Sequence, residues 1–181
     1  SAMSRSYNLV YEIIDLIKKN NLAVVIGGPH ACTFKEDILK ESRADYVILN
    51  EGEYRLKDLM KGKAIEEIDG LIYRQGNRIM SNPPSSFVDI NALPSPDYAK
   101  FELDKYSGGC IGISTSRGCP YSCVFCSVGT TNNKKLRMRS ADSVLKEIKF
   151  WYSKGKYRLE ILDDNFTFEK VRILEICAEI N

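Results

Sequence analysis

The stretch SRGCPYSCVFC, residues 116–126, places Cys119, Cys123 and Cys126 within eight positions. The preceding residues, CIGIST at 110–115, form a short apolar run that predicts a β-strand leading directly into the cysteine loop. Folds of the α/β class carry their chemistry on loops that follow the carboxyl ends of strands. The spacing therefore predicts three thiolates that converge on one site, and it favours a metal there.

The kind of metal follows from what the sequence offers as further ligands. A structural zinc ion needs four ligands, usually from paired CxxC units or from cysteine together with histidine. The only histidine, His30, lies in a different region, and Cys110 and Cys177 have no motif around them. A cluster of four irons can instead be held by three thiolates, with the fourth iron left open for a substrate. The spacing favours this cluster; a zinc site with a ligand elsewhere and three reduced core cysteines are the alternatives.

The sequence RGCPYSCVFC, with the aromatic Phe125 directly before the third cysteine, resembles the cluster loop of the radical S-adenosylmethionine (radical SAM) superfamily. The resemblance implies that Cys119, Cys123 and Cys126 bind a 4Fe–4S cluster. It further implies that the open iron is chelated by S-adenosylmethionine (SAM), and that the backbone around Phe125 contacts the adenine of SAM.

The function implied by this resemblance is reductive cleavage of SAM to a 5′-deoxyadenosyl radical, which then takes a hydrogen atom from a small organic substrate. An external electron donor such as flavodoxin or ferredoxin is implied with it. Two hypotheses from other classes stay open. One is an iron–sulfur protein that only transfers electrons, and the other is a zinc-stabilised binding module.

Two adjacent carboxylates, Asp163 and Asp164, end the next predicted strand in the stretch LDDNFTF, residues 162–168. Both side chains are expected at the mouth of the sheet that carries the cysteine loop, because parallel strands end at the same edge. There they can accept the ammonium group of bound SAM in a charge-assisted contact. The family often has Gly-Gly-Glu at this place, and the alternative is a pair of helix N-cap residues. The sequence leaves both roles open.

The second module, residues 105–181, is predicted to have the order β-α-β-α. Ser140 is placed to cap the first helix, and YRLEIL at 157–162 predicts the second strand. The capped helix carries four apolar residues on one face: Val144, Leu145, Ile148 and Trp151. The last helix, from about Lys170, is expected to face inward with Val171, Leu174, Cys177 and Ile180. With the resemblance, this order indicates the first two strand-helix units of a radical SAM partial TIM barrel.

The first module, residues 3–68, is predicted to follow the order α-β-α-β-α and to form a parallel sheet covered by helices. Helices are predicted at 6–20, 35–42 and 53–62, and strands at 22–28 and 44–49. The first helix carries apolar residues at three-to-four spacing: Leu9, Val10, Ile13, Ile14 and Ile17. The fold class predicted for this module is α/β.

VVIGGPHACTF at 24–34 and ADYVILNEGE at 44–53 resemble the distal half of a Rossmann-like cobalamin-binding domain, which precedes the radical SAM domain in one large subfamily. The resemblance implies that Gly27 and Gly28 let the backbone approach cobalamin in the full-length protein; an ordinary strand-ending turn is the alternative. It implies methyl transfer to an organic substrate, with cyclisation or another rearrangement as the second choice. His30 does not fit the family's cobalt-ligand motif and is expected to be a turn histidine.

Residues 69–104 are expected to connect the two modules. GLIYRQGNRI at 70–79 predicts a β-hairpin around Gly76 and Asn77, and the proline-rich residues that follow resist regular structure.

The charge and composition of the chain indicate neither a nucleic acid nor a membrane as a partner. A net charge of +2 over 181 residues gives no argument for nucleic acid or a membrane surface. The basic segment NNKKLRMRS at 132–140 is expected to be a solvated loop, with contact to a substrate or cofactor carboxylate as the alternative. It has no aromatic residues between its charges, which argues against nucleic-acid binding. An apolar run of about 18 residues, the length that spans a membrane, is absent. A cytoplasmic location is therefore expected.

Both ends of the chain are expected to be cut. Ser1 and Ala2 before Met3 resemble the remnant of a cleaved tag, and two parallel strands cannot cover their own edges. The chain is therefore predicted to be a fragment whose incomplete sheets pair across chains, as a dimer or through a swapped segment.

Overall fold

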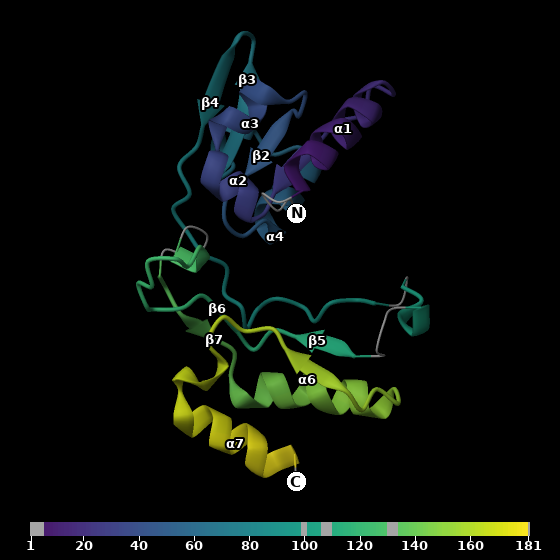
Figure 1. Ribbon diagram of the computed structural model, residues 1–181, viewed down its shortest axis with the longest axis vertical. Helices are drawn as coiled ribbons and strands as arrows, with labels where there is room; N and C mark the ends of the chain where they lie inside the picture. Colours follow the sequence, from purple (N-terminus) through teal and green to yellow (C-terminus); the bar gives the residue numbers. More distant parts are fainter. Residues whose placement is uncertain (1–5, 99–100, 106–109, 130–133, 181) are drawn as a thin grey trace. The chain divides into compact units, whose positions relative to one another are not determined.

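The computed structural model describes residues 6–98, 101–105, 110–129 and 134–180 (Figure 1). The chain divides into two compact units, one of residues 1–88 with 125–131 and the other of residues 89–124 with 132–181. Hydrophobic clusters lie within each unit, so each has a core of its own.

The first unit contains a four-stranded sheet in the order β1-β2-β3-β4. Strands β1 and β2 are parallel, while β2 and β3, and β3 and β4, are antiparallel. Its elements are α1 (Tyr7–Lys18), β1 (Val25–Gly27), α2 (Pro29–Phe34), α3 (Glu36–Glu41), β2 (Tyr46–Ile48), α4 (Glu53–Met60), a 3-10 turn (Ile65–Glu67), β3 (Leu71–Gln75) and β4 (Arg78–Ser81). The predicted helices and strands of this region are all present, and α2 is an additional helix that the sequence analysis did not predict.

The predicted parallel pairing of the first two strands is confirmed, but the sheet of this unit is larger than predicted and is not all parallel. The hairpin β3–β4 forms as predicted, with Gly76 at φ +59°, but it joins the sheet instead of standing apart as a connector. The physical reason is burial: Leu71 and Ile72 of β3 are 0% exposed, and their pairing with β2 covers an edge that would otherwise be open. The sheet is therefore mixed.

Helix α1 contributes less to this core than its apolar pattern predicts. Ile14 is 2% exposed and packs in the cluster that includes Ile38 and Val47, whereas Leu9 and Ile13 are 58% and 45% exposed. Val10, Tyr11 and Ile17 are partly buried against the same cluster, so only part of the predicted stripe is left open.

The second unit contains two small sheets. Strands β5 and β8 form a parallel pair, and β6 and β7 form a two-residue antiparallel pair. Its elements are a 3-10 turn (Leu103–Lys105), β5 (Ile111–Ile113), β6 (Ser116–Arg117), β7 (Arg137–Met138), α6 (Ala141–Ser153), β8 (Leu159–Ile161), a second 3-10 turn (Phe166–Phe168) and α7 (Lys170–Ile180). The predicted order β-α-β-α is confirmed, with β6–β7 added.

Helix α6 follows the sequence prediction closely. Its N-cap is Ser140, whose Oγ accepts a hydrogen bond from the backbone N–H of Ser143 at 3.2 Å. On its inner face, Val144, Leu145 and Trp151 are buried. Trp151 packs against Ile111 and Ile113, so α6 covers the face of β5 and fixes the strand that leads into the cysteine loop.

Helix α7 is present as predicted, but its predicted inner face is wrong. Val171, Leu174 and Ile180 are 63%, 57% and 55% exposed, and Cys177 is also exposed. The buried residues are Ile176, which packs on Val144 and Leu145 of α6, and Arg172. The side chain of Arg172 hydrogen-bonds inside the unit and so sets the rotation of the helix.

Within the part of the chain that the structure describes, none of the helices is both long enough and apolar enough to cross a lipid bilayer.

Candidate functional site

The carboxyl ends of β5 and β8 lie next to each other because the strands are parallel and in register, with Ile113 opposite Ile161. The backbone N–H of Leu162 extends this pairing by donating to the carbonyl of Ile113 at 2.9 Å. The cysteine loop leaves β5 at this edge, and the acidic stretch leaves β8 at the same edge. The predicted convergence of these two segments is therefore confirmed.

Asp163 joins the start of the cysteine loop to the end of β8. Its Oδ1 accepts hydrogen bonds from the backbone N–H of Thr115 at 2.6 Å and of Ser116 at 3.0 Å. Its Oδ2 accepts from the hydroxyl groups of the same two residues. Each carboxylate oxygen thus has two donors, and Thr115 and Ser116 are buried. Asp163 is an anchor of the loop.

The next two residues continue this pattern. Asp164 Oδ2 accepts a hydrogen bond from the backbone N–H of Gly118 at 3.0 Å, and Asn165 Nδ2 lies 4.0 Å from the Sγ of Cys119. Three successive residues after β8 therefore contact three successive points along the loop. Among the described residues, the other carboxylate oxygen of Asp164 has no hydrogen-bond partner, and this side chain is exposed.

Neither aspartate caps a helix. The residue before the 3-10 turn Phe166–Phe168 is Asn165, and α7 begins only at Lys170. The N-cap alternative from the sequence is thus not what these side chains do. The two aspartates differ in their hydrogen bonds: Asp163 is saturated with donors, while Asp164 keeps an accessible oxygen.

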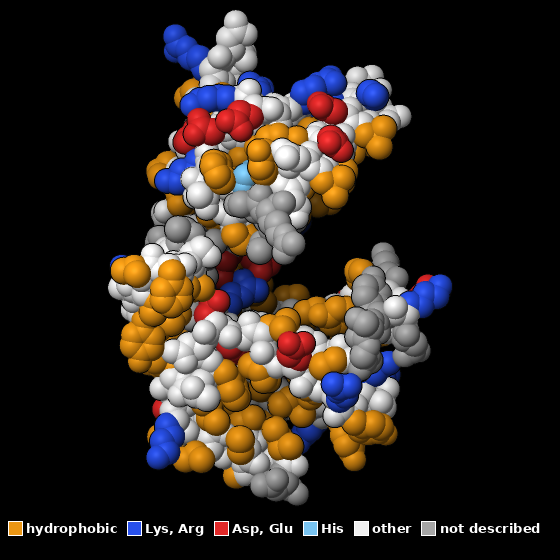
Figure 2. All heavy atoms as spheres, in the orientation of Figure 1, with side chains coloured by type: hydrophobic (Ala, Val, Ile, Leu, Met, Phe, Trp, Pro, Cys, Tyr) orange, Lys and Arg blue, Asp and Glu red, His pale blue; other side chains and the backbone are white. Residues whose placement is uncertain are grey.

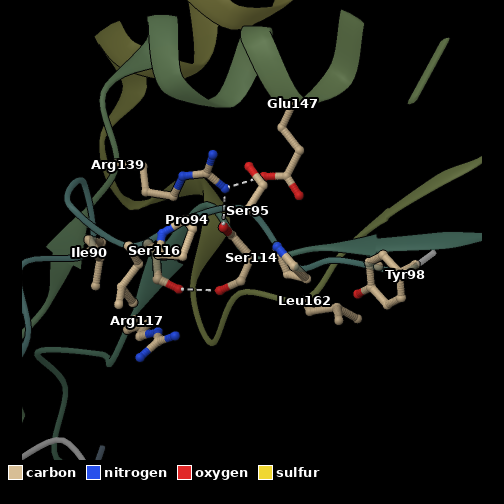
Figure 3. A pocket seen from close by; sticks show the side chains of 13 residues that line it. Ile90, Pro94, Ser95, Tyr98, Ser114, Ser116, Arg117, Arg139, Glu147 and Leu162 are labelled. Atoms are coloured by element: carbon tan, nitrogen blue, oxygen red, sulfur yellow. Dashed lines mark hydrogen bonds and ion pairs between the residues drawn. The ribbon is translucent and has the colours of Figure 1, made fainter. Parts of the chain in front are cut away.

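A cavity of about 200 Å³ lies beside this edge (Figure 3). Arg139 and Glu147 line it and form an ion pair, and Arg139 Nη1 also donates to the carbonyl of Ser114 at 3.0 Å. Glu147 is 5% exposed. Arg139 was expected in a solvated basic loop, and that expectation is wrong for this residue: its guanidinium is held by Glu147 and Ser143.

The three loop cysteines are free thiols, as are the other three in the chain. Cys119 is half-buried, while Cys123 and Cys126 are exposed, and Phe125 is 90% exposed. Free, accessible thiols on one short segment are the donor chemistry that an iron–sulfur cluster requires. In the described residues, however, no three side chains of His, Cys, Asp or Glu are gathered as a metal requires.

The glycine pair of the first unit ends β1. Gly28 has φ +101° and precedes α2, so the backbone there favours glycine. At Gly27, an added Cβ would lie 3.6 Å from the carbonyl oxygen of Ile48, which is an ordinary contact. The backbone conformation alone therefore explains Gly28, and neither steric crowding nor strain explains Gly27.

His30 is buried, with 3% of its surface exposed. Its ring stacks on Tyr7 at 5.8 Å between centroids and lies 4.6 Å from the ring of Phe34. Burial lowers the pKa of His30, and the negative charge of Glu41 opposes this only in part. His30 is thus a core residue in the first turn of α2, so the expectation of a turn histidine is wrong: its ring is buried among aromatic side chains.

Sequence reasoning missed several residues of this region: Thr115, Glu147, Asn165 and Arg172. A single threonine, glutamate, asparagine or arginine carries no spacing pattern. Asn165 lies 46 positions from Cys119, and Arg172 lies 33 and 57 positions from its partners Arg139 and Thr115. Only the fold brings such pairs together.

Comparisons with known proteins agree with the resemblance read from the sequence. No protein-family model matches the chain. Among curated proteins, it is similar to an uncharacterized methyltransferase of Pyrococcus horikoshii, at 34% identity over 190 residues, which cover 99% of this chain and 41% of that protein.

Two solved structures share the fold over nearly the whole chain. TsrM from Kitasatospora setae, a radical SAM methyltransferase solved with cobalamin and a 4Fe–4S cluster bound, has a TM-score of 0.75 and 19% identity, covering 97% of this chain and 36% of TsrM. OxsB, a cobalamin-dependent SAM radical enzyme solved with aqua-cobalamin and SAM, has a TM-score of 0.76 and 25% identity, covering 96% of this chain and 27% of OxsB.

The fold and the loop sequence thus define a class, the radical SAM enzymes. More narrowly, the chain is similar to OxsB, a radical SAM enzyme that depends on cobalamin. It spans less than half the length of each of these proteins.

Proposed function

We propose that the protein carrying this chain is a cobalamin-dependent radical SAM enzyme that transfers a methyl group to a small organic substrate. The observation that supports this most is the loop of three free cysteines, which starts at the joined carboxyl ends of two parallel strands. The relationship to a methyltransferase and to a cobalamin-dependent enzyme supports the reaction class.

The cluster ligands in this proposal are Cys119, Cys123 and Cys126. When bound, a 4Fe–4S cluster supplies the electron for reductive cleavage of SAM to a 5′-deoxyadenosyl radical, with an external donor such as flavodoxin or ferredoxin as its source. The three thiols must gather for this, and the exposure of Cys123 and Cys126 leaves them accessible to do so.

The remaining roles divide between residues near the loop. Asp164 is the better candidate for the ammonium group of SAM, because it keeps an accessible carboxylate oxygen while Asp163 is saturated by Thr115 and Ser116. Phe125, exposed beside Cys126, is proposed to present its backbone to the adenine.

The two units take different parts in the proposed reaction. The first unit is a partial Rossmann-like module with Gly27 and Gly28 at the carboxyl end of β1, where such folds place ligands, and we assign cobalamin to this edge. Residues 105–181, with the cysteine loop, are assigned to the N-terminal part of a radical SAM barrel. Within it, α6 packs on β5, and α7 packs on α6.

Anaerobic reconstitution with iron and sulfide tests the proposed ligands. The chain should take up about four irons and four sulfides per molecule, as a 4Fe–4S cluster requires. Replacing Cys119, Cys123 or Cys126 by alanine should abolish this uptake, because each thiolate holds one iron. Cys177→Ala is the matched control, since Cys177 is also an exposed free thiol, and it should bind a full cluster.

Zinc bound without sulfide would contradict the proposal and favour the zinc-stabilised module. A cluster without SAM cleavage would favour an electron-transfer protein. The reaction class is tested with SAM labelled in its methyl group: under reducing conditions, the protein supplied with cobalamin should form 5′-deoxyadenosine and move the label to cobalamin. Formation of 5′-deoxyadenosine with no transfer of label would instead favour cyclisation or another rearrangement.

A further inference from the structure

Arg172 is a buried cation on α7, with 7% of its surface exposed. Its Nη1 donates to the carbonyl oxygens of Thr115 at 3.4 Å and Arg139 at 3.3 Å. Its guanidinium also lies 6.0 Å from the ring centroid of Phe166. Within the described residues it forms no direct ion pair, and its Nε is buried without a partner. Burying a charged arginine without an ion pair costs free energy, so packing alone does not explain its position.

The hydroxyl of Thr115 connects this cation to an anion. Thr115 Oγ1 accepts a hydrogen bond from Arg172 Nη2 at 3.2 Å and donates one to Asp163 Oδ2. Thr115 is 0% exposed, so both bonds lie in a medium of low dielectric where they are strong. One hydroxyl group therefore joins the guanidinium of α7 to the carboxylate after β8.

The two carbonyl groups that Arg172 contacts lie on opposite sides of the cysteine loop. Thr115 directly precedes β6 and Arg139 directly follows β7, and these two strands pair at the base of the loop. The backbone N–H of Arg139 donates to the carbonyl of Thr115 at 2.9 Å. We call this base, residues 115–117 with 137–139, the neck of the loop. Arg172 thus contacts both strands of the neck at once.

We infer that Arg172 and Thr115 are positioning residues for the cysteine loop: through the neck, they fix the direction in which the segment that carries Cys119 leaves β6. The expected consequence of this positioning is that the cluster is retained, and this consequence rests on the proposed function. It also makes α7 part of the machinery of the loop, although α7 lies more than 40 residues beyond Cys126 in the chain.

The first test uses the chain without a cluster. Thr115→Val keeps the shape of the side chain but removes the hydroxyl, whereas Thr115→Ser keeps the hydroxyl. Thr115→Val should accelerate hydrogen exchange of the Ser116 and Gly118 amides by about tenfold, because Asp163 loses a donor and the neck loosens. Thr115→Ser should restore most of the protection. Thr167→Val, an exposed threonine of the same unit, should change neither amide.

The second test measures retention of the reconstituted cluster. Thr115→Val and Arg172→Gln should lose iron to a chelator about tenfold faster than the wild type and should broaden the electron paramagnetic resonance spectrum of the reduced cluster. Arg158→Gln is the matched control, since Arg158 is an exposed arginine of the same unit. It should behave as the wild type.

The outcomes separate this inference from the proposed function. If the wild type binds no cluster, the proposed function fails, while the exchange experiment still decides whether the neck is held by Thr115. If the neck amides of Thr115→Val exchange hydrogen at the wild-type rate and its cluster loses iron at the wild-type rate, the inference is overturned. If Thr115→Val and Arg172→Gln lower the thermal midpoint but leave amide exchange at the neck and the spectrum unchanged, the two residues are merely structural, and the inference is again overturned.

Discussion

Gly70 leaves the space that the buried guanidinium of Arg55 occupies. It has φ +65°, and a Cβ placed there would lie 2.8 Å from the Nε of Arg55. Arg55 is 6% exposed and pairs with Asp69, and its guanidinium also donates to the carbonyl of Ser86 at 2.8 Å. The guanidinium can approach the backbone only because Gly70 leaves the space empty.

Gly70→Ala should therefore lower the free energy of unfolding by about 2–4 kcal/mol, from the strain of a positive φ together with the displaced arginine. The control is Gly62→Ala, at φ +74° with no atom within 4 Å of the added Cβ, which should cost only about 1 kcal/mol. Urea unfolding measures both. Equal losses in the two variants would show that the contact with Arg55 contributes nothing.

The sequence predicted the residues that repeat in a pattern and not those that act alone. Cys119, Cys123 and Cys126 share a spacing, and Asp163 and Asp164 share a position at a strand end, so both groups were found. Their individual roles were not predictable, because Asp163 differs from Asp164 only through the donors that Thr115 and Ser116 supply. Those donors lie 47 and 48 positions away in the sequence.

At the scale of elements, α1 and α2 are joined through aromatic rings around His30. Tyr7 and Tyr11 of α1 pack against its imidazole, and Tyr11 Oη lies 3.5 Å from Nε2. Phe34 of α2 covers another side, and Glu41 of α3 is the acidic group whose charge acts on the ring. A protonated imidazole in this setting would be poorly solvated.

Stability of the first unit should therefore depend on pH. Burial lowers the pKa of His30 below its ordinary value, so the folded state binds a proton less readily than the unfolded state. The stabilisation is fully present above the unfolded pKa of about 6.5 and is lost as the pH falls through the lower, folded value. The free energy of unfolding should fall from pH 7.5 to pH 5.5, a range set around that reference of about 6.5.

His30→Phe keeps an aromatic ring and removes the proton, so it should abolish most of this pH dependence. His30 is the only histidine in the chain, so the difference in slope between the wild type and His30→Phe measures its contribution. An unchanged slope in His30→Phe would refute the assignment to His30.

The helices and strands were predicted better than the way in which they pair and pack. Hydrophobic period and glycine stops located the helices, the strands and the hairpin, because these depend on neighbouring residues. Pairing of the hairpin with β2 and the rotation of α7 depend on distant residues, and both predictions were wrong. For α7, the sequence offered Leu174 and Val171 as the apolar face, while the polar contacts of Arg172 decided the rotation.

At the scale of the whole chain, α7 leaves an apolar surface open to solvent. Val171, Leu174 and Ile180 are all more than half exposed, and hydrophobic side chains lie open over α6 and α7 (Figure 2). Surfaces of this kind favour association. The chain is accordingly predicted to form a dimer or larger assembly in solution, as the sequence analysis expected from its sheet edges.

Leu174→Glu should weaken this association by placing a charge in the exposed apolar face. Met60→Glu is the control, because Met60 is 80% exposed but belongs to the first unit. Light scattering over a range of protein concentrations measures the mass. A wild-type chain that stays a monomer at high concentration, or a Leu174→Glu variant as associated as the wild type, would contradict the prediction.

The central claim is that Cys119, Cys123 and Cys126 hold a 4Fe–4S cluster with one iron left for SAM. Mössbauer spectroscopy of the anaerobically reconstituted protein, recorded with and without SAM, tests it most directly. The account predicts the spectrum of a 4Fe–4S cluster in which one iron changes its parameters when SAM is added. A protein that forms no such cluster, or a cluster whose four irons are all unaffected by SAM, would contradict it.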